Sequence, residues 1–204
     1  MLSRRAVLLG LPLAGLSACS APQTSSPPDM IASKTYAGNG PRVLTLFTMR
    51  NVRTNGGAHS SLLIDAPSQR IIFDPAGSFR HTTIAERNDV LFGVTPEVES
   101  YYVSYHARET FYVLGQTIRV SDTVAEQALN LALGNGPVAQ SFCTQSTSHL
   151  LRQLPGFGGL PQTFFPNSLA AAFGRLPGVA TREWRENDPD NKKLALAEIE
   201  MQLR

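Results

Sequence analysis

Between residues 42 and 120, short runs of alternating apolar and polar or β-branched residues follow one another, a pattern typical of β-strands. Turn-forming residues such as Gly56 and Pro67 separate the runs. Because the intervening turns are short, we expect the second and third runs to pair as one hairpin and the last two as another. The predicted strands cover residues 42–48, 59–64, 70–74, 99–106 and 110–120.

After residue 120 the apolar positions recur at helical spacing instead. Ser121 is a typical N-cap, and the apolar side chains that follow it share one face until Gly134. Residues 194–203 fit either a helix or a strand. Strands followed by helices predict an α+β domain in which an antiparallel sheet packs against helices. The predicted helices cover residues 121–134, 143–154 and 166–176.

The first residues of the chain resemble an export signal. A basic head with Arg4 and Arg5 precedes a short apolar stretch and then small residues. The paired arginines resemble a twin-arginine signal, and the run from Leu16 to Cys19 resembles the lipobox of bacterial lipoproteins. That resemblance implies that Cys19 is acylated and becomes the mature N-terminus. The alternative is an ordinary signal peptide that happens to contain a cysteine.

The lipobox resemblance also implies a location. Ser20 directly after the cysteine resembles the pattern that favours outer-membrane sorting in Gram-negative bacteria. The implied location is the periplasmic side of the cell envelope, where the lipid on Cys19 makes the membrane a partner. Because residues 20–41 are rich in small and turn-forming residues, we expect a flexible tether there. The predicted organisation is a signal peptide at 1–19, a tether at 20–41, a domain at 42–180 and a C-terminal extension at 181–204.

Composition narrows the function classes. The 204 residues are 42% hydrophobic and 17% charged, which suits one domain with a buried core. The net charge is +2, and no basic stretch is concentrated enough to make nucleic acid a partner. No apolar run has the ~18–20 residues of a membrane-spanning helix. The chain lacks the ligand spacing of a zinc site and a phosphate-binding glycine loop, so the sequence predicts no metal and no other cofactor.

Cys143 and His59 are the candidate reactive residues. If Cys19 carries lipid, Cys143 has no intramolecular partner, which is unusual in an oxidising compartment. Cys143 opens a predicted helix, whose free N–H groups favour the thiolate and can stabilise an oxyanion. His59 opens a predicted strand and is a candidate proton carrier. The alternatives are a buried inert thiol or an intermolecular disulfide, and a strand-edge histidine bonded to the preceding glycine turn.

Two motifs carry a family resemblance: Gly57-Ala-His59-Ser-Ser-Leu-Leu-Ile and Ser141-Phe-Cys143-Thr-Gln. They resemble the permuted papain-like cysteine hydrolases, which are related to NlpC-type peptidoglycan hydrolases and to lecithin:retinol acyltransferase-like enzymes. In permuted members a histidine on a strand precedes a cysteine on a helix. The resemblance covers about residues 42–155, although relatives often have asparagine before the cysteine. It implies a permuted papain-like fold and a catalytic Cys143–His59 pair.

The resemblance also implies a third polar residue that orients the imidazole. Asp74, at the end of the predicted hairpin, is the candidate, with the equal alternative that it starts the following turn. The other histidines are not assigned to the site. His149 follows the cysteine by six positions and so faces elsewhere on the helix. His81 is expected to be a surface-loop residue and His106 a turn residue.

The leading hypothesis is therefore a lipid-anchored envelope hydrolase that cleaves an amide or ester bond. Cys143 is the nucleophile, His59 the base and then the acid, and Asp74 the orienting residue. Cell-wall peptides are the first candidate substrates, followed by acyl esters or lipids. An acyltransferase with the same nucleophile is one alternative. Another is a noncatalytic binding module with four candidate contact residues: Phe164, Phe165, Phe173 and Trp184. Composition favours the alternative that these aromatics belong to the core or cover the late helices.

Overall fold

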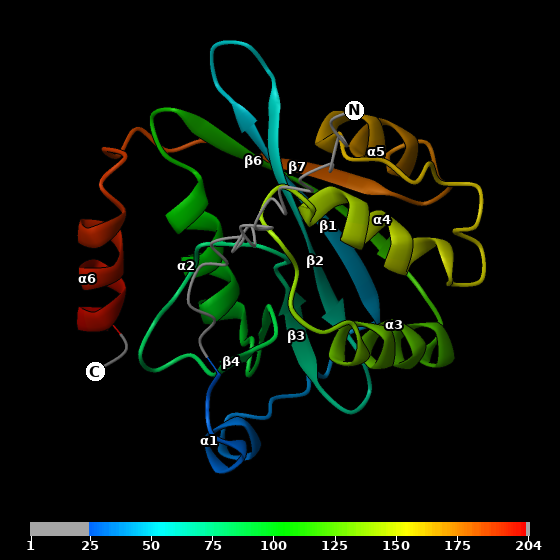
Figure 1. Ribbon diagram of the computed structural model, residues 1–204, viewed down its shortest axis with the longest axis horizontal. Helices are drawn as coiled ribbons and strands as arrows, with labels where there is room; N and C mark the ends of the chain where they lie inside the picture. The colour runs from blue at the N-terminus through cyan, green and yellow to red at the C-terminus, as the bar shows by residue number, and fades with distance from the viewer. Residues whose placement is uncertain (1–24, 203–204) are drawn as a thin grey trace, which may run out of the picture.

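The computed structural model describes residues 25–202, which form one seven-stranded sheet and six helices (Figure 1). The strands are β1 (Val43–Asn51), β2 (Gly57–Asp65), β3 (Arg70–Phe73), β4 (Glu86–Arg87), β5 (Val90–Leu91), β6 (Phe111–Arg119) and β7 (Ala180–Trp184). The helices are α1 (Pro28–Ser33), α2 (Pro96–His106), α3 (Asp122–Gly134), α4 (Cys143–Arg152), α5 (Pro166–Phe173) and α6 (Lys192–Gln202). The sheet order is β4-β5-β3-β2-β1-β6-β7, and all neighbouring strands are antiparallel. The predicted α+β class with an antiparallel sheet is confirmed.

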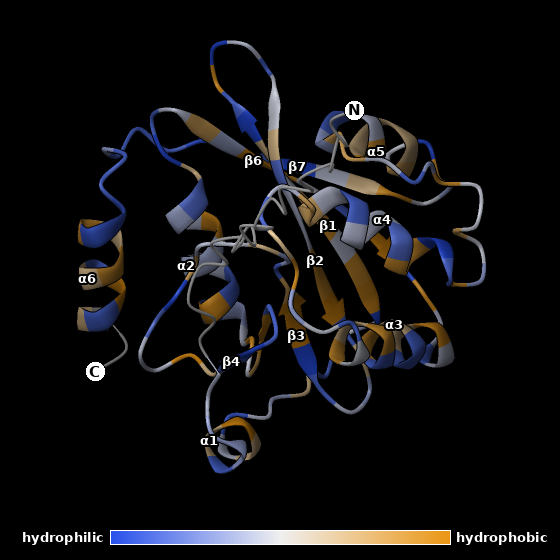
Figure 2. Ribbon diagram, viewed as in Figure 1, coloured by the Kyte–Doolittle hydropathy of each residue, from blue (hydrophilic) through white to orange (hydrophobic). Residues whose placement is uncertain are grey.

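Helices cover both faces of the sheet, because successive side chains of a strand point to opposite faces. On β1, Leu44 and Leu46 pack into one cluster with α3, α4 and α5, whereas Phe47 packs into a second cluster with α2 and α6. In Figure 2 the central strands are largely hydrophobic in colour, while α3 and α6 alternate between hydrophobic and hydrophilic. The central strand β2 is therefore held from both sides.

The segment around residues 99–106 corrects one sequence prediction. It is not a strand but the larger, C-terminal part of α2, and β6 consequently pairs with β1 rather than with a neighbouring hairpin strand. Thr95 caps the helix by accepting a hydrogen bond from the N–H of Val98 at 3.2 Å, and Pro96 occupies its first turn. The tyrosine-rich composition favours a strand, but most of the buried side chains recur at helical spacing: Val98, Tyr101, Tyr102 and Tyr105, with Val103 buried beside them.

The two ends of the described chain also differ from the prediction. The tether was expected over residues 20–41, but the described part of this segment contains α1 and contacts the domain. The N–H of Ser26 donates to the carbonyl of Glu86 at 2.7 Å, and the N–H of Arg70 donates to the carbonyl of Tyr36 at 2.6 Å. At the other end, β7 completes the sheet beside β6, and α6 packs against α2. The ambiguous residues 194–203 are helical up to Gln202.

Within residues 25–202, none of the helices combines the length and the apolar character needed to cross a bilayer.

The N-cap of α2 gives a stability test. Replacing Thr95 with alanine removes the hydroxyl that accepts the Val98 N–H, so the free energy of unfolding should fall by about 1 kcal/mol. Thr95→Ser keeps the hydroxyl and is the matched control. Urea unfolding followed by circular dichroism measures both variants. Equal stability of the alanine and serine variants would contradict the capping role.

Candidate active site

His59 lies where β2 extends past the end of β3. Residues from Leu62 onward pair with β3, and Leu62 itself lies opposite Phe73. Before Leu62, β2 has no partner on that side among the described strands, although β1 still pairs on the other, with Met49 opposite His59. This open edge of β2 lets side chains from outside the sheet meet His59 and the backbone of Ser60.

Asp74 follows the last residue of β3 directly and brings a buried carboxylate to this edge. Its Oδ1 lies 2.7 Å from Nε2 of His59 and accepts a hydrogen bond from the Tyr102 hydroxyl, also at 2.7 Å. The Ser61 hydroxyl lies 2.7 Å from the Tyr102 oxygen, in position to donate to it. Burial raises the pKa of Asp74, but the charge and hydrogen bond of His59 outweigh it and hold the pKa at about 2.

His59 presents its two ring nitrogens to two different partners. Because Nε2 faces Asp74, Nδ1 is the nitrogen left to interact with Cys143, which also raises the pKa of His59. Burial lowers the pKa of His59, but the charge and hydrogen bond of Asp74, with a smaller contribution from Cys143, raise it to about 10. The imidazole is therefore protonated at neutral pH and is held in a fixed orientation.

Cys143 is the first residue of α4, and its side chain is buried beside the open edge of β2. Burial raises the pKa of the thiol, but the hydrogen bond and charge of His59, the N–H of Ser60 and the Thr144 hydroxyl lower it to about 7. The Thr144 oxygen lies 3.7 Å from Sγ and 3.1 Å from the Ser60 hydroxyl oxygen. The site thus favours a thiolate–imidazolium pair near neutral pH.

The start of α4 also supplies donors for a negatively charged oxygen. The N-cap residue Phe142 makes no side-chain cap, and the first N–H groups of a helix have no acceptor within the helix. The N–H of Cys143 is one of them. Gln140 is exposed and borders the cavity beside His59, so its amide N–H₂ is a further candidate donor.

Asp89 joins the loop that carries Asp74 to the loop that precedes α4. Its Oδ2 accepts the N–H of Val138 at 2.7 Å, in the loop before α4. Its backbone carbonyl accepts the N–H of Asp74 at 2.7 Å, and its carboxylate also binds the N–H of Ala76. Asp89 has a φ of 63°, a left-handed conformation that aspartate tolerates better than most residues. The residue therefore fixes the distance between the two loops.

His106 belongs to the site, although the sequence predicted only a turn residue. Its ring stacks on that of His59 with centroids 6.2 Å apart, and Nδ1 lies 2.8 Å from the carbonyl of Tyr102. Burial lowers the pKa of His106 to about 4, helped by the positive charge of His59 and despite the charge of Asp74. A neutral ring that donates from Nδ1 has an accepting Nε2. The sequence missed His106 and Tyr102 because a predicted strand left no helix to carry them here.

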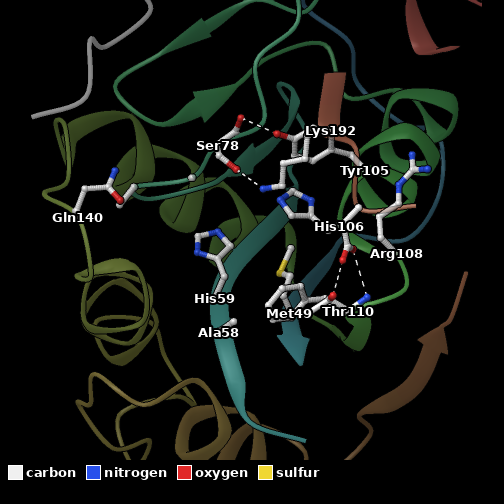
Figure 3. Close-up of a pocket in the computed structure, with 14 residues that line it drawn as sticks. Met49, Ala58, His59, Ser78, Tyr105, His106, Arg108, Thr110, Gln140 and Lys192 are labelled. Carbon is white, nitrogen blue, oxygen red and sulfur yellow. Dashed lines mark hydrogen bonds between the residues drawn. The ribbon is translucent and has the colours of Figure 1, made fainter. Parts of the chain in front are cut away.

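A cavity of about 410 Å³ opens beside His59 and His106 (Figure 3). Met49, Ala58 and Phe111 give it apolar walls, and residues 190 and 192, from the C-terminal part of the chain, form another side. Figure 3 shows Gln140 apart from the other labelled side chains, on the far side of His59 from His106. The cavity size falls in the lower part of the ~300–1,000 Å³ range of small-molecule sites.

The other residues singled out in the sequence lie elsewhere. His149 is exposed on α4, as expected, whereas His81 has a buried ring that bonds to Thr83 at 2.9 Å and faces Glu200 at 3.3 Å. Phe173 is fully buried, which fits the expectation that it packs in the core rather than contacting a partner. Cys19 lies outside the described residues. Within residues 25–202, no group of three or more His, Cys, Asp or Glu side chains is arranged to hold a metal.

No protein-family model matches the chain, and no solved structure matches it. Among curated proteins, it is similar to a 3-dehydroquinate dehydratase of Synechococcus sp. (strain CC9605), with 40% identity over 79 residues. The similar region covers 38% of this chain and 49% of the dehydratase, so the chain spans about half the length of that relative.

The lowered pKa of Cys143 predicts the pH dependence of its alkylation. Because the thiolate is the nucleophile, the rate with iodoacetamide should rise with pH through a midpoint near 7. Asp74→Asn removes the charge that holds His59 protonated, so the midpoint should move up by one pH unit or more. Mass spectrometry of the Cys143 peptide measures both rates. A wild-type midpoint at the ~8.5 of a free thiol would contradict the thiolate–imidazolium pair.

Proposed function

We propose that the protein is a lipid-anchored envelope hydrolase that cleaves an amide or ester bond with Cys143 as its nucleophile. The observation that carries the proposal is the position of His59, whose ring joins the buried carboxylate of Asp74 to the thiol of Cys143. A histidine with a structural role needs only one hydrogen-bond partner. A histidine that serves as general acid and base for a thiol nucleophile needs both the nucleophile and a group that orients its ring. Cell-wall peptides are the first substrates to test because the export signal implies an envelope location.

The reaction follows from the charges of the pair. The Cys143 thiolate attacks the substrate carbonyl carbon, and the oxygen takes up the negative charge near the first N–H groups of α4. When the tetrahedral intermediate collapses, the carbon–nitrogen or carbon–oxygen bond breaks, and the His59 imidazolium gives its proton to the leaving group. Water then attacks the thioester while His59 takes a proton from it. The acid product leaves, and the thiolate–imidazolium pair is restored.

Asp74 supports this cycle without touching the reacting atoms. By binding Nε2 it keeps Nδ1 directed at the sulfur, and its charge stabilises the imidazolium. The order of a histidine on a strand before a cysteine at a helix start supports a permuted papain-like architecture within the α+β class. The partial likeness to a dehydratase carries no competing proposal, because it covers 38% of the chain.

The direct test is digestion of purified cell-wall muropeptides by the full-length protein. Cys143→Ala removes the nucleophile and should lower kcat/KM by about 10³-fold or more. His149→Gln changes an exposed histidine on the same helix and is the matched control. Chromatography with mass spectrometry identifies the products. Full activity of the alanine variant would refute the proposal.

The same digestion separates hydrolysis from acyl transfer. A hydrolase gives the free acid as product, and adding glycinamide as an acceptor should leave the free acid dominant. If the acyl group appears mainly on glycinamide, the acyltransferase alternative replaces the hydrolase proposal, with the same nucleophile.

The anchor is tested separately, by labelling growing bacteria with radioactive palmitate. The wild-type protein should incorporate the label and sediment with the membrane fraction, because acyl chains supply the membrane affinity. Cys19→Ala should lose both properties, while Cys143→Ala, the matched cysteine variant, should keep both. Label in the Cys19 variant would contradict the anchor at this position.

A further inference from the structure

The C-terminal residues place a cation in the cavity that His59 and His106 line. Lys192 lines the cavity, and Figure 3 shows its ammonium pointing inward, toward the rings of His106 and His59. Nζ donates a hydrogen bond to the Ser78 hydroxyl at 2.8 Å and lies 5.0 Å from the centre of the Tyr105 ring. Ser78 follows the loop of Asp74, so Lys192 connects the end of the chain to the edge of the site.

Folding gives little reason for a lysine at this position. Lys192 is the first residue of α6, where the positive end of the helix dipole disfavours a cation, and the first turn contains no acidic residue. Within residues 25–202, its ammonium forms no ion pair with a carboxylate. Burial lowers the pKa of Lys192, against the attraction of the more distant Asp74 and Asp190. A desolvated charge without a close counter-ion contributes little to the stability of the fold, but it can bind an anionic ligand.

The other charged side chains of the cavity have other partners. Asp190 accepts hydrogen bonds from both the backbone N–H and the hydroxyl of Thr110. Arg108 extends toward Asp188 and Glu198, at 3.7 and 4.0 Å, and Figure 3 shows its guanidinium pointing away from His59. Lys192 is therefore the charged group that is available to a molecule bound beside His59.

We propose that Lys192 binds a carboxylate of the substrate, with the Ser78 hydroxyl as a second donor, and so selects amides or esters that carry a free carboxylate near the scissile bond. This specificity rests on the proposed function. One ammonium and one hydroxyl match a single negative charge. A phosphate dianion fits less well, because Asp190 lines the same cavity and would repel it. The apolar walls formed by Met49, Ala58 and Phe111 suit the carbon chain between the carboxylate and the carbonyl.

The proposal is tested with alkylating reagents that differ only in charge, since these need no knowledge of the natural substrate. In each, the Cys143 thiolate displaces iodide from an iodomethyl carbon. One pair is iodoacetate and iodoacetamide; a longer pair is N-iodoacetylglycine and N-iodoacetylglycinamide. Rates of Cys143 labelling in the full-length protein are measured by mass spectrometry. For each pair, the labelling rate with the anionic reagent divided by the rate with the neutral reagent measures how strongly the site attracts the carboxylate.

Lys192→Gln should lower this ratio about tenfold for the longer pair, the effect of losing one charge-assisted hydrogen bond. Lys192→Arg should keep a high ratio, and Lys192→Glu should lower it further. Lys193→Gln removes the neighbouring positive charge and is the matched control, with an unchanged ratio. An equal fall in the Lys193 variant would indicate a general surface-charge effect and would overturn the proposal, as would a Lys192→Gln ratio equal to wild type in both pairs.

The outcomes also separate this proposal from the hydrolase itself. If Cys143 has a midpoint near pH 7 and catalyses digestion, but the ratio does not depend on Lys192, the carboxylate site fails and the hydrolase stands. If Cys143 reacts like an ordinary buried thiol with all reagents, the hydrolase fails. N-iodoacetyl-aminoethyl phosphate distinguishes the anion: stronger Lys192-dependent labelling by the phosphate than by the carboxylate would overturn the assignment of a carboxylate.

Discussion

The hydrogen-bonded contact between Asp74 and His59 is the interaction on which the site depends. A carboxylate that is 1% exposed is costly to bury unless an opposite charge accompanies it. Within the described residues its Oδ2 has no hydrogen-bond partner, and a Cβ on Gly77 would lie 1.8 Å from that oxygen. Tyr102 and His59 must therefore stabilise the charge through Oδ1 alone. The negative charge of Asp74 raises the pKa of His59 and keeps its ring protonated, and the protonated ring in turn favours the thiolate of Cys143.

The sheet contributes by ending one strand early. If β3 continued alongside β2, its backbone would occupy the edge next to Ser60, and the sulfur of Cys143 could not accept the Ser60 N–H. Instead the chain turns away after Phe73, with Asp74 at the turn, and α4 points its first residue into the open edge. Asp89 then holds the two loops together through the N–H groups of Asp74 and Val138. Strand length and one buried aspartate thus set the geometry of the reactive pair.

Much of this arrangement could be predicted from local sequence signals. Alternation predicted β1 to β3, capping and apolar spacing predicted α3 and α4, and the ends of these elements placed His59, Asp74 and Cys143. The residues that the sequence missed depend on tertiary context. Residues 99–106 have the composition of a strand, yet the cap at Thr95 and the packing of the buried side chains make them part of the helix α2. This helix places Tyr102 and His106 at the site. Lys192 belongs to a stretch with mixed periodicity, and nothing local indicates that it lines the same cavity as a histidine 133 positions earlier in the chain.

The electrostatics of the two stacked histidines account for the change of His59 from acid to base in the proposed cycle. His59 and His106 line one cavity, but their charges differ: Asp74 keeps His59 protonated, whereas burial keeps His106 neutral. The imidazolium of His59 is therefore the proton donor next to the sulfur. The hydrogen bond and charge of Cys143 both raise the pKa of His59. Acylation turns the thiolate into a neutral thioester and removes both effects, so the pKa of His59 falls at the moment when it has given its proton to the leaving group. The ring is then a neutral base beside the thioester, as water attack requires. Asp74 keeps it oriented throughout, and no second titrating residue is needed.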